Sequence, residues 1–274
     1  MKSTVMDTSP NRSIYERPAI VAEYAKAGEL TAAEDKLLYR YETTIIGGHV
    51  LDLGVGAGRT TPFLASRAAS YVGIDYSQQM IEACRQRFPQ LQFRRGDARD
   101  LSDYASGSYD FVLFSFNGID CVSHEGRMQV LREIARVLRP GGVFIFSSHN
   151  LEVVGTGTFM PAIFRVRLSA NPVRSAKAIA RVGLRLVNYA RNRRHQYRVS
   201  DHAILTDPAH EFSMSHYYVT PSAQRRQLIE AGFSADIDIE PGVDQAKPYF
   251  LYYVATKTAG LQAGDAGEAW APGC

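Results

Sequence analysis

The sequence predicts a doubly wound α/β fold, in which helices cover both faces of a parallel sheet. Two observations lead to this fold class. Short apolar segments of β character alternate with helical segments between residues 49 and 148, and some of the strands are apolar on both faces. The same alternation returns after residue 220. A chain of 274 residues, 45% hydrophobic and 22% charged, fits one large globular domain with an insertion.

The first half of the alternation can be assigned segment by segment. Apolar side chains at near-helical spacing predict a helix over residues 30–45. Strands are expected over 49–53, 71–76, 91–97, 109–116 and 143–148. Helices are expected to begin near residue 59, to cover 77–88 with Ser77 as N-cap, and to cover 125–138 before the sequence "RPGG".

The second half begins with a break in the pattern. Residues 151–215 are predicted to form an irregular insertion with one helix, over 172–192, opened by Asn-Pro. A helix then begins at Pro221 and ends at Gly232, and strands follow over 234–240 and 249–256. Three parts complete the expected organisation: a leader or lid helix over 1–28, a main domain over 29–256 that contains the insertion, and a flexible tail over 257–274.

Composition excludes several protein classes. The three cysteines (Cys84, Cys121 and Cys274) are scattered without a C-x-x-C pair, which argues against a disulfide framework or a metal site and favours a reducing compartment. The N-terminus has no apolar core of a signal peptide. No apolar run approaches the roughly 18 residues that cross a bilayer. The expectation is a cytoplasmic protein.

The segment "LDLGVGAGRT", residues 51–60, indicates a ligand site. Gly54, Gly56 and Gly58 lie between a strand and a helix, where backbone can approach a ligand closely and the helix N-terminus presents free N–H groups. The G-x-G-x-G spacing differs from the G-x-G-x-x-G of dinucleotide dehydrogenases. Asp75 ends the next strand, 21 residues after Gly54, where a carboxylate can accept hydrogen bonds from ribose hydroxyls. Asp97 ends the third strand, where it can meet an adenine amino group.

Five blocks of sequence resemble the ordered motifs of class I S-adenosylmethionine-dependent methyltransferases. They are "VLDLGVGAGRTTPFLA", "YVGIDYSQQMIEACRQRFP", "FRRGDARDL", "YDFVLFSFNGIDCVSH" and "LREIARVLRPGGVFIFSSHN". The resemblance covers residues 30–150 and resumes over 216–256. It implies a Rossmann-like sheet of about seven strands with an antiparallel last strand, a helical insertion after the fifth strand, and S-adenosylmethionine as cofactor.

The resemblance also implies roles for individual residues. Asp52 and the loop residues Gly54, Gly56, Ala57 and Gly58 would hold the methionine part, and Asp75 the ribose. The remaining cofactor contacts that it implies are Tyr76, Met80, Gly96, Asp97 and Ala98 around the adenine, and Phe114, Ser115 and Asn117 at the methyl-transfer mouth. Tyr15 and Tyr24 lie where many relatives fold an N-terminal helix over the cofactor, although an ordinary packed helix explains them equally well.

The sulfonium of such a cofactor is already an activated leaving group, so positioning dominates catalysis. Positioning contributes about 7–11 kcal/mol, whereas a general base contributes about 10²–10⁴-fold. If a base is used, the candidates are His124 and His149, because each lies just beyond the C-terminal end of a strand. A helix-capping role for His124 and a loop hydrogen bond for His149 remain the alternatives. His216, Tyr217 and Tyr218 are second-rank candidates for substrate contact.

The insertion is strongly basic. Between Val153 and Ser200 there are ten Lys or Arg residues and no acidic residue, whereas the rest of the chain has 21 basic and 28 acidic residues. Arg174, Lys177, Arg181 and Arg185 form one stripe of the predicted helix. In the resembled family such an insertion covers the substrate, so Arg174 and Arg181 would contact an anionic acceptor.

Other partners for this stripe remain open. An anionic membrane surface, RNA phosphates and solvent alone would each suit a basic helix. The acidic remainder of the chain and the lack of an RNA-binding module disfavour nucleic acid.

The sequence therefore predicts methyl transfer from S-adenosylmethionine to a small molecule, at oxygen first and nitrogen next. An RNA nucleoside methyltransferase and a non-catalytic cofactor-binding or scaffold protein are the alternatives. The acceptor and the oligomeric state are left open.

Overall fold

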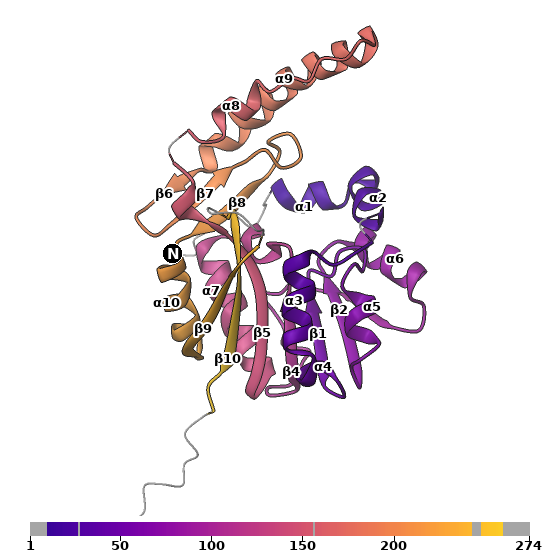
Figure 1. Cartoon of the computed structure of the whole chain (residues 1–274), viewed down its shortest axis with the longest axis vertical. Coiled ribbons are helices and arrows are strands. Elements are labelled where there is room, and N and C mark those ends of the chain that lie inside the picture. The colour runs from indigo at the N-terminus through magenta and orange to yellow at the C-terminus, as the bar shows by residue number, and fades with distance from the viewer. Residues whose placement is uncertain (1–9, 27, 156, 243–247, 260–274) are drawn as a thin grey trace, which may run out of the picture.

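A ten-stranded sheet forms the centre of the chain (Figure 1). The structure, a computed structural model, describes residues 10–26, 28–155, 157–242 and 248–259. Residues 1–9 and 27 of the predicted leader or lid segment lie outside these ranges, as do residues 260–274 of the predicted tail, which include Cys274.

Seven of the strands reproduce the expected doubly wound arrangement. Five parallel strands lie in the order β3 (Gln92–Arg95), β2 (Ser70–Asp75), β1 (His49–Leu53), β4 (Tyr109–Phe114) and β5 (Leu138–Asn150). The last strand, β10 (Phe250–Lys257), pairs antiparallel with both β5 and β9 (Phe233–Pro241). The expected fold class and the reversed last strand are confirmed.

Three further strands extend the sheet: two lie in the insertion, which was expected to be irregular apart from one helix, and the third begins at its last residue. β8 (Ser215–Val219) pairs in parallel with the end of β5, and β7 (His202–Thr206) and β6 (Tyr197–Arg198) follow it as antiparallel neighbours. The prediction of an irregular segment was wrong for β6 and β7, whose two and five residues are too few to show a clear periodicity. β8 is buried along its whole length and therefore lacks the polar–apolar alternation of a half-exposed strand. β5 extends to Asn150 and provides the edge that β8 needs.

Ten α-helices and three short 3₁₀ helices occur in the described part of the chain. The α-helices are α1 (Pro10–Tyr15), α2 (Pro18–Lys26), α3 (Ala32–Arg40), α4 (Glu42–Ile45), α5 (Thr61–Ala65), α6 (Gln78–Arg87), α7 (His124–Val137), α8 (Met160–Ile163), α9 (Pro172–Asn192) and α10 (Pro221–Ala231). The 3₁₀ helices are η1 (Gly118–Cys121), η2 (Leu151–Val153) and η3 (Arg193–His195). The single helix predicted over 30–45 is two helices, because Tyr41 leaves the helical conformation.

Local capping interactions explain several helix ends. The Ser77 hydroxyl accepts the Met80 N–H and begins α6 as predicted. Gly232, at φ +103°, ends α10 in the left-handed conformation. Ser123, and not His124, caps α7, since its hydroxyl accepts the Gly126 N–H.

The sheet separates two apolar cores. On one face, side chains of α7 and α10 such as Leu131 and Leu228 pack against the strands. On the other face, side chains of α3, α5 and α6 such as Leu38, Leu64 and Ile81 do so. No helix among the described residues is long and apolar enough to cross a membrane.

Candidate active site

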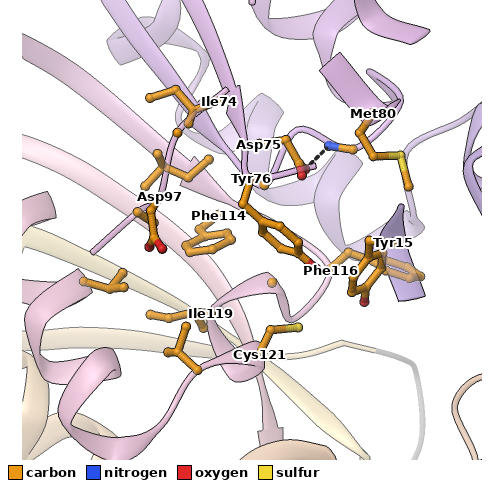
Figure 2. Close-up of a pocket in the computed structure, with 18 of the residues that line it drawn as sticks. Tyr15, Ile74, Asp75, Tyr76, Met80, Asp97, Phe114, Phe116, Ile119 and Cys121 are labelled. Carbon is orange, nitrogen blue, oxygen red and sulfur yellow. Dashed lines mark hydrogen bonds between the residues drawn. The ribbon is translucent and has the colours of Figure 1, made fainter. Parts of the chain in front are cut away.

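A pocket lies at the C-terminal ends of β1, β2 and β4, and residues of α1 and α2 contribute to its wall (Figure 2). This is the edge at which open α/β sheets bind ligands. Most of the sequence-predicted cofactor residues line it: Tyr15, Tyr24, Gly54, Gly56, Asp75, Tyr76, Met80, Gly96, Asp97, Ala98, Phe114 and Ser115. Residues up to 100 positions apart in the sequence thus face one cavity.

Ten further residues line the pocket that were not predicted from the sequence. They are Asn11, Leu53, Ile74, Arg99, Phe116, Gly118, Ile119, Cys121, Val122 and Val130. Those over 116–122 directly follow β4, so the rule that ligands gather beyond strand ends could have identified them. Asn11 carried no such signal, because only the folded chain brings α1 to this edge.

The glycine loop and Asp75 form one hydrogen-bonded unit. Gly54, Gly56 and Gly58 all have positive φ angles, of 60°, 54° and 82°, which favour glycine. The Asp75 carboxylate accepts the N–H of Gly56 at 2.9 Å (Figure 2) and the N–H of Ser77, also at 2.9 Å. Burial raises the pKa of Asp75 to about 6, against the lowering effect of these backbone hydrogen bonds. The loop and the strand end therefore hold each other in place beside the pocket.

The lining fits a nucleoside-containing cofactor. A nearly buried carboxylate at the end of β2 suits a ribose diol, and Ile74 and Met80 provide apolar walls for a base. The hydroxyl of Tyr76 is buried and has no hydrogen-bond partner in the described structure. A buried polar atom without a partner is costly, and a ligand atom in the pocket would satisfy it.

An aromatic cluster closes the pocket on the N-terminal side. The ring of Tyr15 packs edge-on against Tyr24 and Tyr76, with centroid separations of 5.8 and 5.9 Å. The backbone of the same segment is tied to α6, because the Ser77 hydroxyl donates to the Tyr15 carbonyl at 3.1 Å and the Glu16 carboxylate accepts the Gln78 N–H. The α1–α2 segment is thus fixed over the site.

The chain is strained just after β4. Phe116 and Asn117 have φ angles of 54° and 59°, and such angles in residues other than glycine cluster at functional sites. The Asn117 N–H donates to the Ser147 hydroxyl at 2.8 Å, which helps to hold the conformation. Phe116 remains 53% exposed, with the guanidinium of Arg59 over its ring.

Four predicted cofactor residues do not line the pocket: Asp52, Ala57, Gly58 and Asn117. The Asp52 carboxylate is buried beneath the loop and accepts the hydroxyls of Thr60 and Tyr71, at 2.6 and 2.9 Å. Its position supports the loop from behind.

His149 has the geometry of an oriented base. Its Nδ1 donates to the Asp120 carboxylate at 2.7 Å, which leaves Nε2 able to accept a proton. That nitrogen lies 3.4 Å from the Asn117 amide nitrogen, next to the end of β4. Burial alone would raise the pKa of Asp120, but Arg127 and His149 outweigh it and hold the pKa below its usual value.

His124 occupies a different environment. Its ring stacks on His202 with a centroid separation of 4.3 Å, and its Nδ1 lies 2.7 Å from the hydroxyl of the fully buried Tyr217. Neither His124 nor Tyr217 lines the pocket. Desolvation lowers the pKa of His124.

The other substrate candidates, His216, Arg174 and Arg181, also lie outside the pocket lining. His216 is 6% exposed, and its Nδ1 lies 2.7 Å from Asp207, which also accepts the Tyr218 hydroxyl. Potential ligand atoms of His149, Asp207 and His216 lie within 4.8 Å of one another, so this group has the composition of a metal site, although Asp207 and His216 already bind each other. Arg174 and Arg181 belong to α9 and do not line the pocket.

Residues 50–142 match the sequence model of the methyltransferase domain family. The match begins in β1 and includes the glycine loop, Asp75, Asp97 and the segment after β4. Over residues 50–142 the chain therefore carries a methyltransferase domain. This assignment agrees with the position of the pocket, which lies at the ends of the strands in the matched region.

Three named relatives of the domain are methyltransferases. The chain is 33% identical over 172 residues to the phthiotriol/phenolphthiotriol dimycocerosates methyltransferase of Mycobacterium tuberculosis, a match that covers 60% of this chain and 59% of that protein. It is 36% identical to the fatty-acid O-methyltransferase of Mycolicibacterium smegmatis, with 39% of each chain covered. It is 30% identical to the demethylmenaquinone methyltransferase of Clavibacter sepedonicus, with 50% of this chain and 59% of that one covered. The matches thus span less than two thirds of these relatives.

Solved methyltransferase structures share the fold. An S-adenosylmethionine-dependent methyltransferase from Mesorhizobium loti superposes with a TM-score of 0.53 at 17% identity, covering 82% of this chain and 98% of its own. The Burkholderia thailandensis 1,6-didemethyltoxoflavin-N1-methyltransferase, solved with its acceptor and S-adenosylhomocysteine, gives a TM-score of 0.55 at 16% identity, with 90% and 84% covered.

Proposed function

We propose that this chain transfers a methyl group from S-adenosylmethionine to an oxygen atom of a lipid-like small molecule. The observation that carries the proposal is the nearly buried Asp75 carboxylate, held by the glycine loop at the edge of the pocket. The cofactor supplies a methyl group already activated on a sulfonium, so the protein's main task is to hold the acceptor in line with it.

The cofactor is assigned to the predicted residues that line the pocket. Asp75 would accept both ribose hydroxyls, Asp97 and Ala98 would face the edge of the adenine, and the loop from Gly54 would hold the methionine part. Tyr15 and Tyr24 would cover the cofactor and exclude water, which strengthens electrostatic interactions inside the site.

His149 is assigned as the general base for a hydroxyl acceptor. Asp120 fixes the tautomer of His149, and Nε2 lies beside Asn117, which does not line the pocket but stands between the pocket residues Phe116 and Gly118. A carboxylate acceptor would need no base, because it is already ionised. Nitrogen remains the second choice of acceptor atom.

The lipid-like character of the acceptor rests on two supports. The named relatives act, by their names, on dimycocerosates, fatty acids and demethylmenaquinone, all of which have large apolar parts. Beyond β4 the pocket wall is largely apolar, with Phe116, Ile119, Cys121 and Val122. Apolar walls of this kind favour an apolar acceptor.

Calorimetric titration with S-adenosylhomocysteine tests the cofactor assignment. The native protein should bind, and an Asp75→Asn variant should bind at least about tenfold more weakly because it loses the charged acceptor for the diol. Asp103→Asn, in an exposed loop, is the matched control and should bind normally. The proposal is overturned if the native protein does not bind, or if Asp75→Asn binds as tightly as the control.

Transfer of a radiolabelled methyl group tests the acceptor. Native protein and Asp75→Asn would be incubated with labelled cofactor and total bacterial lipid extract, and the organic phase would be counted. Label released by mild alkali indicates a methyl ester, and alkali-stable label that hydriodic acid releases as methyl iodide from a neutral lipid indicates an ether, whereas label that resists both treatments would indicate transfer to carbon and contradict the choice of oxygen. Label recovered only in amine-containing products would contradict the choice of oxygen.

A further inference from the structure

α9 turns its apolar side away from the protein. It is the longest helix of the described chain, with 21 residues, and only Asn192 in it is buried. In Figure 1 it extends from the body well beyond the edge of the sheet. Five of its large apolar side chains are between 41% and 61% exposed, namely Val173, Ile179, Leu184, Leu186 and Val187, whereas Val182 and Tyr189 are half-buried. A surface helix ordinarily buries such a face and exposes its polar one.

The contacts of α9 with the body explain this orientation. Arg185 forms an ion pair with Glu211 and donates to the Arg165 carbonyl at 2.7 Å. Asn188 and Asn192, one and two turns further along, donate to backbone carbonyls of residues 211 and 212, at 2.8 and 3.0 Å. The helix is therefore anchored through polar side chains. Val187 follows Arg185 by two positions, about 200° around the helix, and so lies on the opposite, outer side.

Further apolar surface lies at the base of the helix. Met160 in α8 is 40% exposed, and Phe164 and Leu168 in the connection to α9 are 59% and 71% exposed. The end of α8 packs against α9, since Arg185 also reaches the carbonyls of residues 162 and 163. Side chains of this size rarely gather on a surface that stays in water.

The charge of the segment selects the partner. Residues 153–200 contain ten Lys or Arg residues and no acid, so two copies of this segment would repel each other. Within α9, Lys177 borders the apolar face, whereas Arg174 and Arg181 lie within about 40° of Arg185 around the helix, on its polar side. Arg181 is 65% exposed and lies 3.8 Å from Glu211. A helix that combines an exposed apolar face with cations on its border and its other side is complementary to a surface that offers acyl chains between anionic headgroups.

We propose that α9 docks this protein on an anionic lipid bilayer, lying in the plane of the headgroups with its apolar face toward the acyl chains. A helix of 21 residues is about 32 Å long, which gives a long contact line without crossing the membrane. If the proposed function holds, this docking would also place the enzyme next to acceptors dissolved in the membrane.

Vesicle co-sedimentation tests the docking without cofactor or acceptor. The native protein should bind vesicles of phosphatidylcholine with 30% phosphatidylglycerol, bind pure phosphatidylcholine vesicles at least about tenfold more weakly, and be released by high salt. Ile179→Asp places a charge on the outer face and should weaken binding on the order of tenfold or more. Ile229→Asp is the matched control, because Ile229 is a similarly exposed apolar residue on α10.

A second pair of measurements separates the other outcomes. The double variant Arg174→Gln/Lys177→Gln should lose the preference for anionic vesicles, while circular dichroism shows an unchanged fold. The proposal is overturned if native protein stays in the supernatant with anionic vesicles, or if Ile179→Asp binds like Ile229→Asp. It is equally overturned if light scattering shows a dimer in which Ile179 is needed for association, since a second copy would then cover the face. Each of these results leaves the cofactor titration unaffected.

Discussion

The Nδ1 atom of His149 lies 2.7 Å from Oδ2 of Asp120, two residues that are 29 positions apart in the sequence. The same carboxylate accepts from Arg127 and from the Ser148 hydroxyl, at 2.6 and 2.7 Å. Asp120 is therefore fixed by a cation and a hydroxyl, and it in turn fixes the ring of His149. This relationship gives the proposed base a defined tautomer.

Replacing His149 should slow transfer to a hydroxyl acceptor without weakening cofactor binding. His149→Gln keeps a donor toward Asp120 but removes the basic nitrogen, so kcat should fall about 10²–10⁴-fold. Affinity for S-adenosylhomocysteine should stay unchanged, because His149 does not line the pocket. His195→Gln, in η3, serves as control. An unchanged kcat in His149→Gln would remove the base assignment.

Cofactor affinity should weaken as the pH falls through about 6. Burial raises the pKa of Asp75 to about 6, and only the carboxylate form can accept from both ribose hydroxyls. Titration with S-adenosylhomocysteine at several pH values should therefore show affinity lost on the acid side. Asp52 also has its pKa raised by burial to about 6. If the affinity of an Asp75→Asn variant does not change with pH, the pH dependence of the native protein comes from Asp75. If the variant keeps the pH dependence, another group causes it.

The pair of His216 and Asp207 should stabilise the fold over a wide pH range. The pKa of His216 is raised well above its usual value despite burial, because Asp207 outweighs desolvation, and the pKa of Asp207 is lowered to about 2. Because the pKa of His216 is raised on folding, its charged form stabilises the fold fully below the unfolded pKa of about 6.5. This stabilisation is lost as the pH rises through the folded pKa. Because the pKa of Asp207 is lowered on folding, its charged form stabilises the fold fully above about pH 3.8, the pKa of an unfolded aspartate. This stabilisation is lost as the pH falls toward 2.

Removing one partner of this pair should therefore be costly near neutrality. His216→Gln leaves Asp207 without its charged partner, a change of about 3–5 kcal/mol in the free energy of unfolding for a buried pair. Urea unfolding near pH 6 should show this difference, and the gap from the native protein should narrow at strongly alkaline pH. A gap that widens with rising pH would mean that His216 is neutral in the native state.

Gly54 should not tolerate a side chain. It has φ +60°, and an added Cβ would lie 2.6 Å from the ring of Phe114. Gly47→Ala is a matched control, because Gly47 has φ +70° with nothing within 4 Å of an added Cβ. Gly47→Ala should lower the free energy of unfolding only by the cost of the left-handed backbone conformation, about 1–2 kcal/mol. Gly54→Ala should lower the free energy of unfolding by more than this and should also bind S-adenosylhomocysteine weakly. Thermal unfolding would measure the stability of both variants, and calorimetry their affinity for S-adenosylhomocysteine. If the two variants behave alike, a clash between the added Cβ and Phe114 is excluded as the cause.

Local sequence determined the strands of the doubly wound part of the sheet, the caps and the position of the glycine loop. Ser77, Asn171 and Gly232 act within a few residues of themselves, so their roles could be predicted without a fold. The residues at the ends of β1, β2, β3 and β4 could also be predicted to meet, because parallel strands bring their C-terminal ends to one edge. That rule accounts for Asp75, Asp97 and Phe114.

Only the tertiary structure decided which partners the polar residues of the second half would find. Strand β8 forms because β5 extends to receive it, and the pairs His149–Asp120 and His216–Asp207 form because separate segments are packed together. The sequence showed that α9 is amphipathic and basic, but not which of its sides would face the protein. That choice was made by Arg185, Asn188 and Asn192, which bind carbonyl and carboxylate groups of distant segments. Long-range hydrogen bonds of this kind have no local sequence signal, and here they turn an apolar face outward.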